Sequence, residues 1–187
     1  MKRIITLTLA LCLLCAAALA ETATLTRVDF GGFSLELDEQ YLTVGNKVNN
    51  QVFAQYVPPM EGGMITANLN IVWAQDGTEA ELEPDALAAY GETLTTQLGS
   101  ALSAQGMTVK SCEVLNTGVE DVEGKRVGAI VILTTLDLSA YGLGEISMYT
   151  YQIMFTTEQG GYVITMTFEN EADFAVFAPI LESLQWT

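Results

Sequence analysis

The 187-residue chain contains no histidine, only three cysteines, and seven basic residues against 23 acidic ones. The lack of histidine excludes the usual serine and cysteine triads, which need an imidazole base, and removes a common zinc ligand. No glycine-rich phosphate loop is present, because Gly142 and Gly144 lie between predicted strands rather than at a strand-to-helix turn. Glycosidase chemistry by a pair of carboxylates stays open, but the signal has almost no specificity, because any two of 23 acids could lie at the required distance. These absences argue against an enzyme and against a bound cofactor.

The first twenty residues have the three-part layout of a secretory signal peptide. Lys2 and Arg3 precede an apolar run over residues 4–15, and Ala18-Leu19-Ala20 supplies a small-x-small cleavage pattern. The apolar run is too short for a membrane span. We therefore expect a signal peptide over residues 1–20, cleavage after Ala20, and a secreted or extracytoplasmic protein with no stable membrane span.

Cleavage after Ala20 would remove Cys12 and Cys15 and leave Cys112 as the one cysteine. A lipid anchor is not expected, because leucine precedes both early cysteines where lipid attachment needs a small residue. A lone cysteine cannot form a disulfide within its own chain. We expect Cys112 to be a buried, inert thiol, with an intermolecular disulfide as the alternative.

The second strong feature is the charge that remains after cleavage. Beyond residue 20 the chain has five basic residues and 23 acidic ones, which gives a net charge of −18. Such a surface repels phosphate backbones and anionic membranes, so we expect no nucleic-acid partner. Solubility outside the cell accounts for the acidity, with cation binding or docking to a basic partner as alternatives.

Acidic residues are most concentrated just before the longest predicted helix. Calcium takes six to eight oxygen ligands, and closely spaced acids in a loop could supply some of them. The segment lacks the spacing and the closing glutamate of a calcium loop, so a solvated loop explains it better. A weak calcium site remains the alternative hypothesis, with the candidate ligands Asp76, Glu79, Glu81, Glu83 and Asp85.

Alternating apolar residues and turn signals predict a mostly β chain with two helices. Strands are expected over residues 33–37, 41–44, 52–57, 65–73, 108–114, 127–136, 146–156 and 162–168. A long helix is predicted from Pro84 to just before Gly106, with an apolar stripe of leucines and Tyr90. A second helix should follow the N-cap Asn170, and Pro179 should kink or restart it.

Two strands carry apolar residues in an unusual arrangement. Residues 127–136 are apolar on both faces, which predicts a central strand covered on both sides. On the next strand, Tyr149 and Tyr151 share a face with Ile153 and Phe155. These tyrosines fit either core packing against a helix or a strip that faces a ligand, and the sequence leaves both interpretations open.

The order of elements predicts an α+β fold, in which one antiparallel β-sheet is flanked by helices on both sides. The long helix follows the first strands, and the short helix ends the chain. We expect a short N-terminal lead-in over residues 21–30 and a single globular domain over residues 31–187.

The whole-chain pattern, from about residue 31 to residue 186, also resembles a known family. The domain opens on Phe33-Ser34-Leu35-Glu36-Leu37 and closes on the strand 162–168, Asp173-Phe174 and the helix 177–184. This pattern resembles the PsbP-like proteins, which include the DcrB-like exported proteins and lipoproteins of bacteria. The resemblance implies an α/β/α sandwich and an accessory, assembly or binding role.

The resemblance implies a partner but no site. An unidentified protein partner is expected, and the chain itself should be a monomer or a weak oligomer. No site residue is carried over, because the histidine-based cation ligands of some members have no counterpart in this chain.

Overall fold

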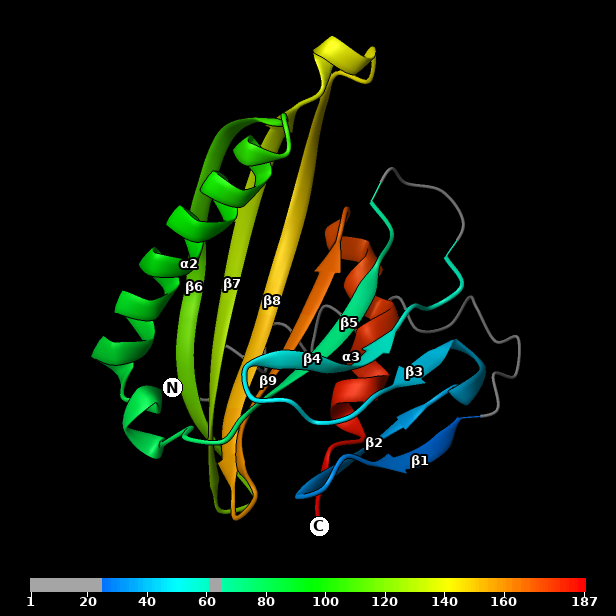
Figure 1. The fold of residues 1–187 in the computed structure, drawn as a ribbon, viewed down its shortest axis with the longest axis vertical. Helices are drawn as coiled ribbons and strands as arrows, with labels where there is room; N and C mark the ends of the chain where they lie inside the picture. Colours follow the sequence, from blue (N-terminus) through cyan, green and yellow to red (C-terminus); the bar gives the residue numbers. More distant parts are fainter. Residues whose placement is uncertain (1–24, 61–64) are drawn as a thin grey trace.

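The structure is a computed structural model that describes residues 25–60 and 65–187, apart from the side chains of residues 79 and 80. The predicted signal peptide and its cleavage site lie outside the described residues. Within the described part, two β-sheets and two α-helices form the fold shown in Figure 1.

The larger sheet has seven antiparallel strands in the order β3-β4-β5-β9-β8-β7-β6. The four long strands at one end, β6 to β9, follow one another as a meander. Tight turns join β6 to β7 and β8 to β9, and residues 138–144, which contain the 3-10 helix η3 (Ser139–Tyr141), join β7 to β8. Their neighbours complete the sheet, and the seven strands are β3 (Leu42–Val44), β4 (Gln51–Tyr56), β5 (Asn68–Ala74), β6 (Thr108–Val122), β7 (Lys125–Asp137), β8 (Glu145–Thr157) and β9 (Gly160–Phe168).

The turns between the long strands lie where the sequence predicts them. Glu123 and Gly124 adopt φ values of 52° and 83° between β6 and β7, and Gly160 has φ of 122° beside the β8–β9 turn. Strand β6, however, runs eight residues beyond the predicted end at residue 114. Two register shifts, between Val109 and Ser111 and between Val114 and Asn116, break its alternation and hide the continuation in the sequence.

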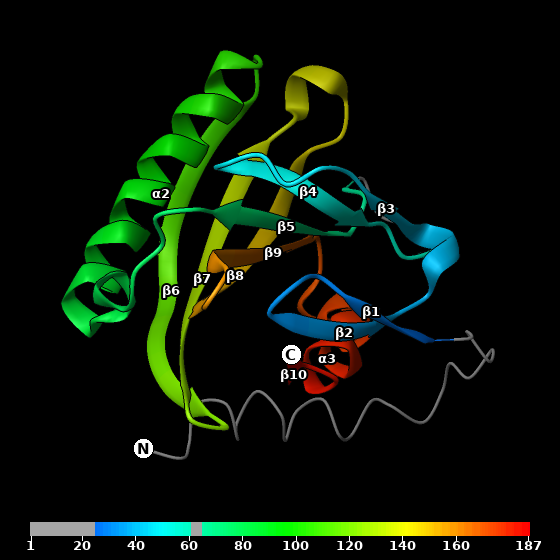
Figure 2. The same cartoon turned by 60° about the horizontal axis from the view of Figure 1, so that its bottom comes forward.

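Helix α2 (Pro84–Ala104) covers one face of β6 and β7 (Figures 1 and 2). Pro84 starts the helix as predicted, and Gly106, with φ of 85°, follows its end. Leu87 and Leu94 are buried against Ile130 and Ile132 of β7. Tyr90, which was predicted to lie in this stripe, is 38% exposed at its margin.

Part of the opposite face of the large sheet is covered by a second layer (Figure 2). This layer consists of helix α3 (Phe174–Glu182) and a three-stranded sheet of β1 (Thr26–Asp29), β2 (Phe33–Leu37) and β10 (Gln185–Trp186). Phe33, Leu35 and Leu37 of β2 are fully buried and belong to the same core as residues of β5, β8 and β9. The predicted α+β class, with helices on both sides of an antiparallel sheet, is confirmed.

The predicted lead-in over residues 21–30 is wrong for its second half. Residues 26–29 form β1, which pairs antiparallel with β2, and Phe30 is only 3% exposed. Arg27 holds the strand in place by an ion pair to Glu36 at 2.6 Å and by donating to the Ser183 carbonyl at 2.9 Å. Strand β1 has little apolar alternation, so its sequence does not reveal it. Hydrogen bonds and the ion pair hold it in place rather than burial.

The C-terminal helix begins as expected, and of the two outcomes predicted at Pro179, a kink or a restart, the restart is wrong. Asn170 and Asp173 form a reciprocal capping box at the 3-10 helix η4 (Glu171–Asp173), which leads into α3. Helix α3 continues through Pro179 to Glu182 and does not restart there. Pro179 is exposed, so water can bond the carbonyl group that loses its N–H partner. No described helix is long and apolar enough to cross a membrane.

We predict that Phe33→Ala lowers the free energy of unfolding by about 3–5 kcal/mol, because it leaves a cavity where the two sheets meet. The ring is fully buried, and its centroid lies 4.9 Å from that of Phe155 and 5.0 Å from that of Tyr162. Urea unfolding measures the change. Val52→Ala, at a position 53% exposed, is the control and should change stability by less than about 0.5 kcal/mol. An equal loss of stability in both variants would contradict the importance of the Phe33 ring where the two sheets meet.

Candidate functional site

The two faces of β7 have different environments, which corrects the prediction of a strand covered on both sides. Ile130 and Ile132 are fully buried beneath α2. Ala129, Val131 and Leu133, on the other face, are only half-buried. The layer formed by α3 and the small sheet packs over β5, β9 and part of β8, and it leaves this part of β7 and β6 uncovered.

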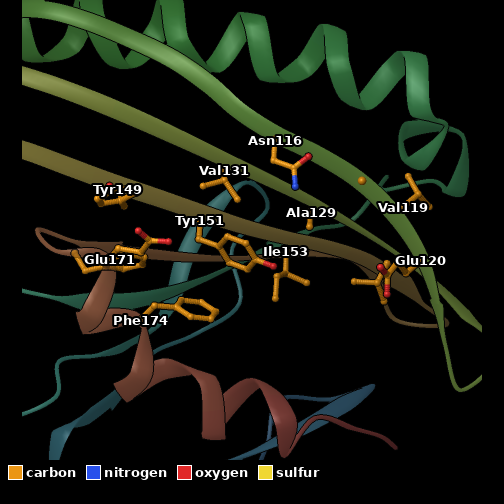
Figure 3. A pocket seen from close by; sticks show the side chains of 13 residues that line it. Asn116, Val119, Glu120, Ala129, Val131, Tyr149, Tyr151, Ile153, Glu171 and Phe174 are labelled. Carbon is orange, nitrogen blue, oxygen red and sulfur yellow. The ribbon is translucent and has the colours of Figure 1, made fainter. Parts of the chain in front are cut away.

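The uncovered face carries a groove of about 330 Å³ (Figure 3). Strands β6, β7 and β8 form its floor, and the end of β9, η4 and the start of α3 form its wall. The lining is predominantly apolar and comprises Asn116, Gly118, Val119, Glu120, Val127, Ala129, Val131, Tyr149, Tyr151, Ile153, Phe168, Glu171 and Phe174. The strand register places Asn116, Gly118 and Glu120 opposite Val131, Ala129 and Val127.

Four aromatic rings form a continuous wall of the groove. Tyr149 stacks on Phe168 with 5.6 Å between ring centroids, and Tyr151 meets Phe174 edge-on at 5.3 Å. Phe168 and Phe174 are themselves 5.9 Å apart. The interpretation as core packing against a helix is confirmed for Tyr151, whose ring meets Phe174 of α3. The interpretation as a strip that faces a ligand stays a prediction, although both tyrosines are half-buried and line the groove.

Two carboxylates line the same groove. Glu120, on β6, lies near Tyr151, and Glu171 is the first residue of the capped helix η4. In Figure 3, Tyr151 and Ile153 lie between these two glutamates. Burial raises the pKa of the Tyr151 phenol above its ordinary value, and the negative charge of Glu120 raises it further. The groove thus combines apolar surface, aromatic faces and negative charge, a set suited to binding apolar and cationic groups.

The sequence signals for this groove were present but incomplete. The apolar second face of β7 and the tyrosine strip of β8 both point to it. Asn116, Gly118 and Glu120 were missed, because the predicted strand ended at residue 114. Glu171 was missed as a site residue because nothing in the sequence places η4 beside β8.

The acidic segment has a different arrangement. Asp76 follows β5, Glu79 and Glu81 belong to the 3-10 helix η2 (Glu79–Leu82), and Asp85 lies in the first turn of α2. Glu83 accepts a hydrogen bond from Arg126 at 2.5 Å, and this bond, with the charge of Arg126, lowers the pKa of Glu83. Among the described side chains, which omit that of Glu79, no three acids or cysteines are grouped as metal ligands. The calcium alternative stays a prediction, tested by a calcium-dependent rise in melting temperature.

Cys112 is half-buried on the face of β6 that α2 covers. Its sulfur lies 3.3 Å from the Thr134 hydroxyl oxygen. It packs against the cluster that contains Leu87 and Ile132. The expected apolar environment is present, although burial is partial.

No protein-family model and no curated protein sequence matches this chain. The solution structure of cyanobacterial PsbP (CyanoP) from Synechocystis sp. PCC 6803 is similar, with a TM-score of 0.60 and 14% sequence identity. That match covers 90% of this chain and 95% of CyanoP. The chain therefore has a PsbP-like fold, and at this identity the likeness shows the fold alone.

Two further solved structures are more distant. A Pseudomonas aeruginosa protein of unknown function, PA94, a putative regulator, matches with a TM-score of 0.39 at 12% identity over 84% of this chain and 91% of its own. A STAR-related lipid transfer protein from Xanthomonas axonopodis matches with a TM-score of 0.27 at 12% identity over 82% of this chain and 96% of its own. Neither likeness is close enough to carry an argument. The DcrB-like part of the resemblance stays a prediction.

We predict that Glu120→Gln lowers the pKa of Tyr151 but leaves it above the ordinary value of 10.0, because burial still disfavours the phenolate. The ultraviolet absorbance of phenolate during an alkaline titration measures the shift. The difference between titrations with and without Tyr151→Phe isolates this residue from the other tyrosines. Glu158→Gln, at an exposed turn, is the control, and a shift of equal size there would contradict the assignment to Glu120.

The same pKa shift predicts how stability depends on pH. In the unfolded chain Tyr151 ionises first, so the free energy of unfolding falls as the pH rises past about 10. Tyr151→Phe removes this contribution and should flatten the alkaline decline in stability, as measured by urea unfolding at several pH values. An unchanged slope would show that the phenol is not shielded in the folded state.

Proposed function

We propose that this protein is an exported, non-enzymatic accessory domain that binds a protein partner through the groove on β6, β7 and β8. The observation that carries the proposal is the uncovered, preformed aromatic and apolar groove over β6, β7 and β8. Export is proposed from the N-terminal signal layout. The acidic composition supports solubility outside the cell.

Several features of the groove support a protein as the partner. Exposed aromatic residues in a well-formed depression are typical anchor points of protein interfaces. Strand β6 is the edge of the seven-stranded sheet, so an extended segment of a partner can lie beside it. Gly118 lies on this edge strand and lines the groove without a side chain to block the approach.

A non-enzymatic role is supported by the residues that line the groove. The described lining residues include two carboxylates, a carboxamide and two phenols. They include no serine, threonine, cysteine or lysine. The groove therefore offers binding surface rather than the nucleophile and base of a covalent mechanism. The preformed floor of three paired strands holds this surface without further folding.

We predict that the neutral fluorescent probe N-phenyl-1-naphthylamine binds saturably in the groove. Gly118→Phe should weaken this binding at least about tenfold, which corresponds to ~1.4 kcal/mol, because the new ring occupies the site. A Cβ at Gly118 meets no atom within 4 Å, so the substitution is compatible with the fold. Fluorescence titration of the purified protein measures the affinity.

Gly99→Phe is the matched control for this experiment. Gly99 lies in α2, where an added Cβ also meets nothing within 4 Å, and the new ring would lie outside the groove. This variant should bind the probe as the unmodified protein does. No saturable binding, or equal binding by Gly118→Phe, would overturn the groove as the binding surface.

A further inference from the structure

We infer that the groove selects a cationic side chain, so that its occupant is a segment of the partner protein that presents arginine or lysine between apolar residues. This inference rests on the proposed function and adds the chemistry of the partner. It is carried by the position of two carboxylates along an aromatic wall, in a groove whose described lining residues include no basic one.

The carboxylates of the groove take part in none of the described ion pairs. Glu120 and Glu171 line it, and none of its thirteen lining residues is basic. The described ion pairs engage Glu36, Glu83 and Glu145 instead. A neutral apolar occupant would remove water from Glu120 without replacing its hydrogen bonds, which is unfavourable. A cation in the same place would gain the charge interaction as water leaves.

The aromatic wall favours a cation with an apolar stem. Tyr151 and Phe174 present half-buried rings, over which an ammonium or guanidinium group gains electrostatic stabilisation. The methylene groups of lysine or arginine can lie along Val131 at the floor of the groove. Arginine fits best, because its planar group stacks on rings and also bonds carboxylates through two nitrogens.

The protein uses the same contact elsewhere in its own fold. The Lys47 ammonium lies 4.9 Å from the ring centroid of Tyr162 and 5.4 Å from that of Phe53. Lys125 lies 5.4 Å from the ring of Trp186. Cations over aromatic rings are therefore compatible with the surfaces of this fold, and the groove presents such rings without a cation.

The charge of the whole chain supports the same partner. Beyond residue 20 the chain has five basic residues and 23 acidic ones. This excess attracts a basic partner and repels an acidic one, so association should be faster at low salt. Burial is the larger cause of the raised pKa of Tyr151, and the negative charge of Glu120 within the groove raises it further.

The test compares two peptides of equal shape and different charge. The first peptide is acetyl-Leu-Val-Arg-Val-Leu-amide. The second peptide has citrulline, the uncharged isostere, in place of arginine. Binding to the purified protein is followed by amide chemical-shift changes in NMR titrations, which also locate the site. We expect the arginine peptide to bind at least about tenfold tighter than the citrulline peptide and to weaken as salt rises.

Matched variants assign the preference to the groove. Glu120→Gln and Glu171→Gln should each reduce the preference for arginine over citrulline, while both peptides still shift the amides of β7 and β8. Glu158→Gln removes the same charge at an exposed turn away from the lining and should keep the preference. A preference that survives both groove substitutions would overturn the inference.

The outcomes separate this inference from the proposed function. Equal binding of the two peptides in the groove would overturn the selection of a cation and leave the groove as a binding surface. Binding of neither peptide would overturn the inference, and titration with the neutral probe would decide the proposed function by itself. If dodecyltrimethylammonium binds tightly and neither peptide binds, the groove is assigned to a cationic amphiphile instead of a protein segment.

Discussion

The structure depends on the aromatic joint by which the small sheet closes onto the large one. Tyr162 of β9 stacks near Phe155 and meets Phe33 of β2 edge-on, with centroids 5.8 Å and 5.0 Å away. Its hydroxyl donates to the Gly31 carbonyl and accepts from the Lys47 ammonium at 2.6 Å. Because the phenol makes these contacts only when β2 lies across β8 and β9, the joint fixes the position of the second layer.

The position of that layer determines where the groove lies. The small sheet and α3 are too narrow to cover the whole face, so the surface over β6 and β7 stays open on that side. Exposed apolar surface is unfavourable, and the fold limits it by stacking Tyr149 on Phe168 and by packing Tyr151 against Phe174. What remains is a half-exposed aromatic surface, held on paired strands, which is the kind of feature that marks interaction sites.

The distribution of charge decides which kind of ligand this surface favours. The few basic residues are used in structural contacts, such as Arg27 with Glu36 and Lys47 over Tyr162. The groove carboxylates Glu120 and Glu171 have no such partner among the described ion pairs. The fold therefore satisfies its own cations internally and presents negative charge where its apolar surface is open. A partner that supplies a cation with an apolar stem complements both properties.

The sequence by itself determined most of the elements and the class of the fold. Local signals sufficed for α2, which Pro84 and Gly106 delimit, for the turn at Glu123 and Gly124, and for alternating strands such as β2, because neighbours in the chain set these features. Only the tertiary structure decided that residues 26–29 form a strand, since their partner is β2 and an ion pair holds them. It also decided that the second apolar face of β7 is open. Periodicity shows that a face is apolar, but the reach of a distant layer decides whether that face is covered.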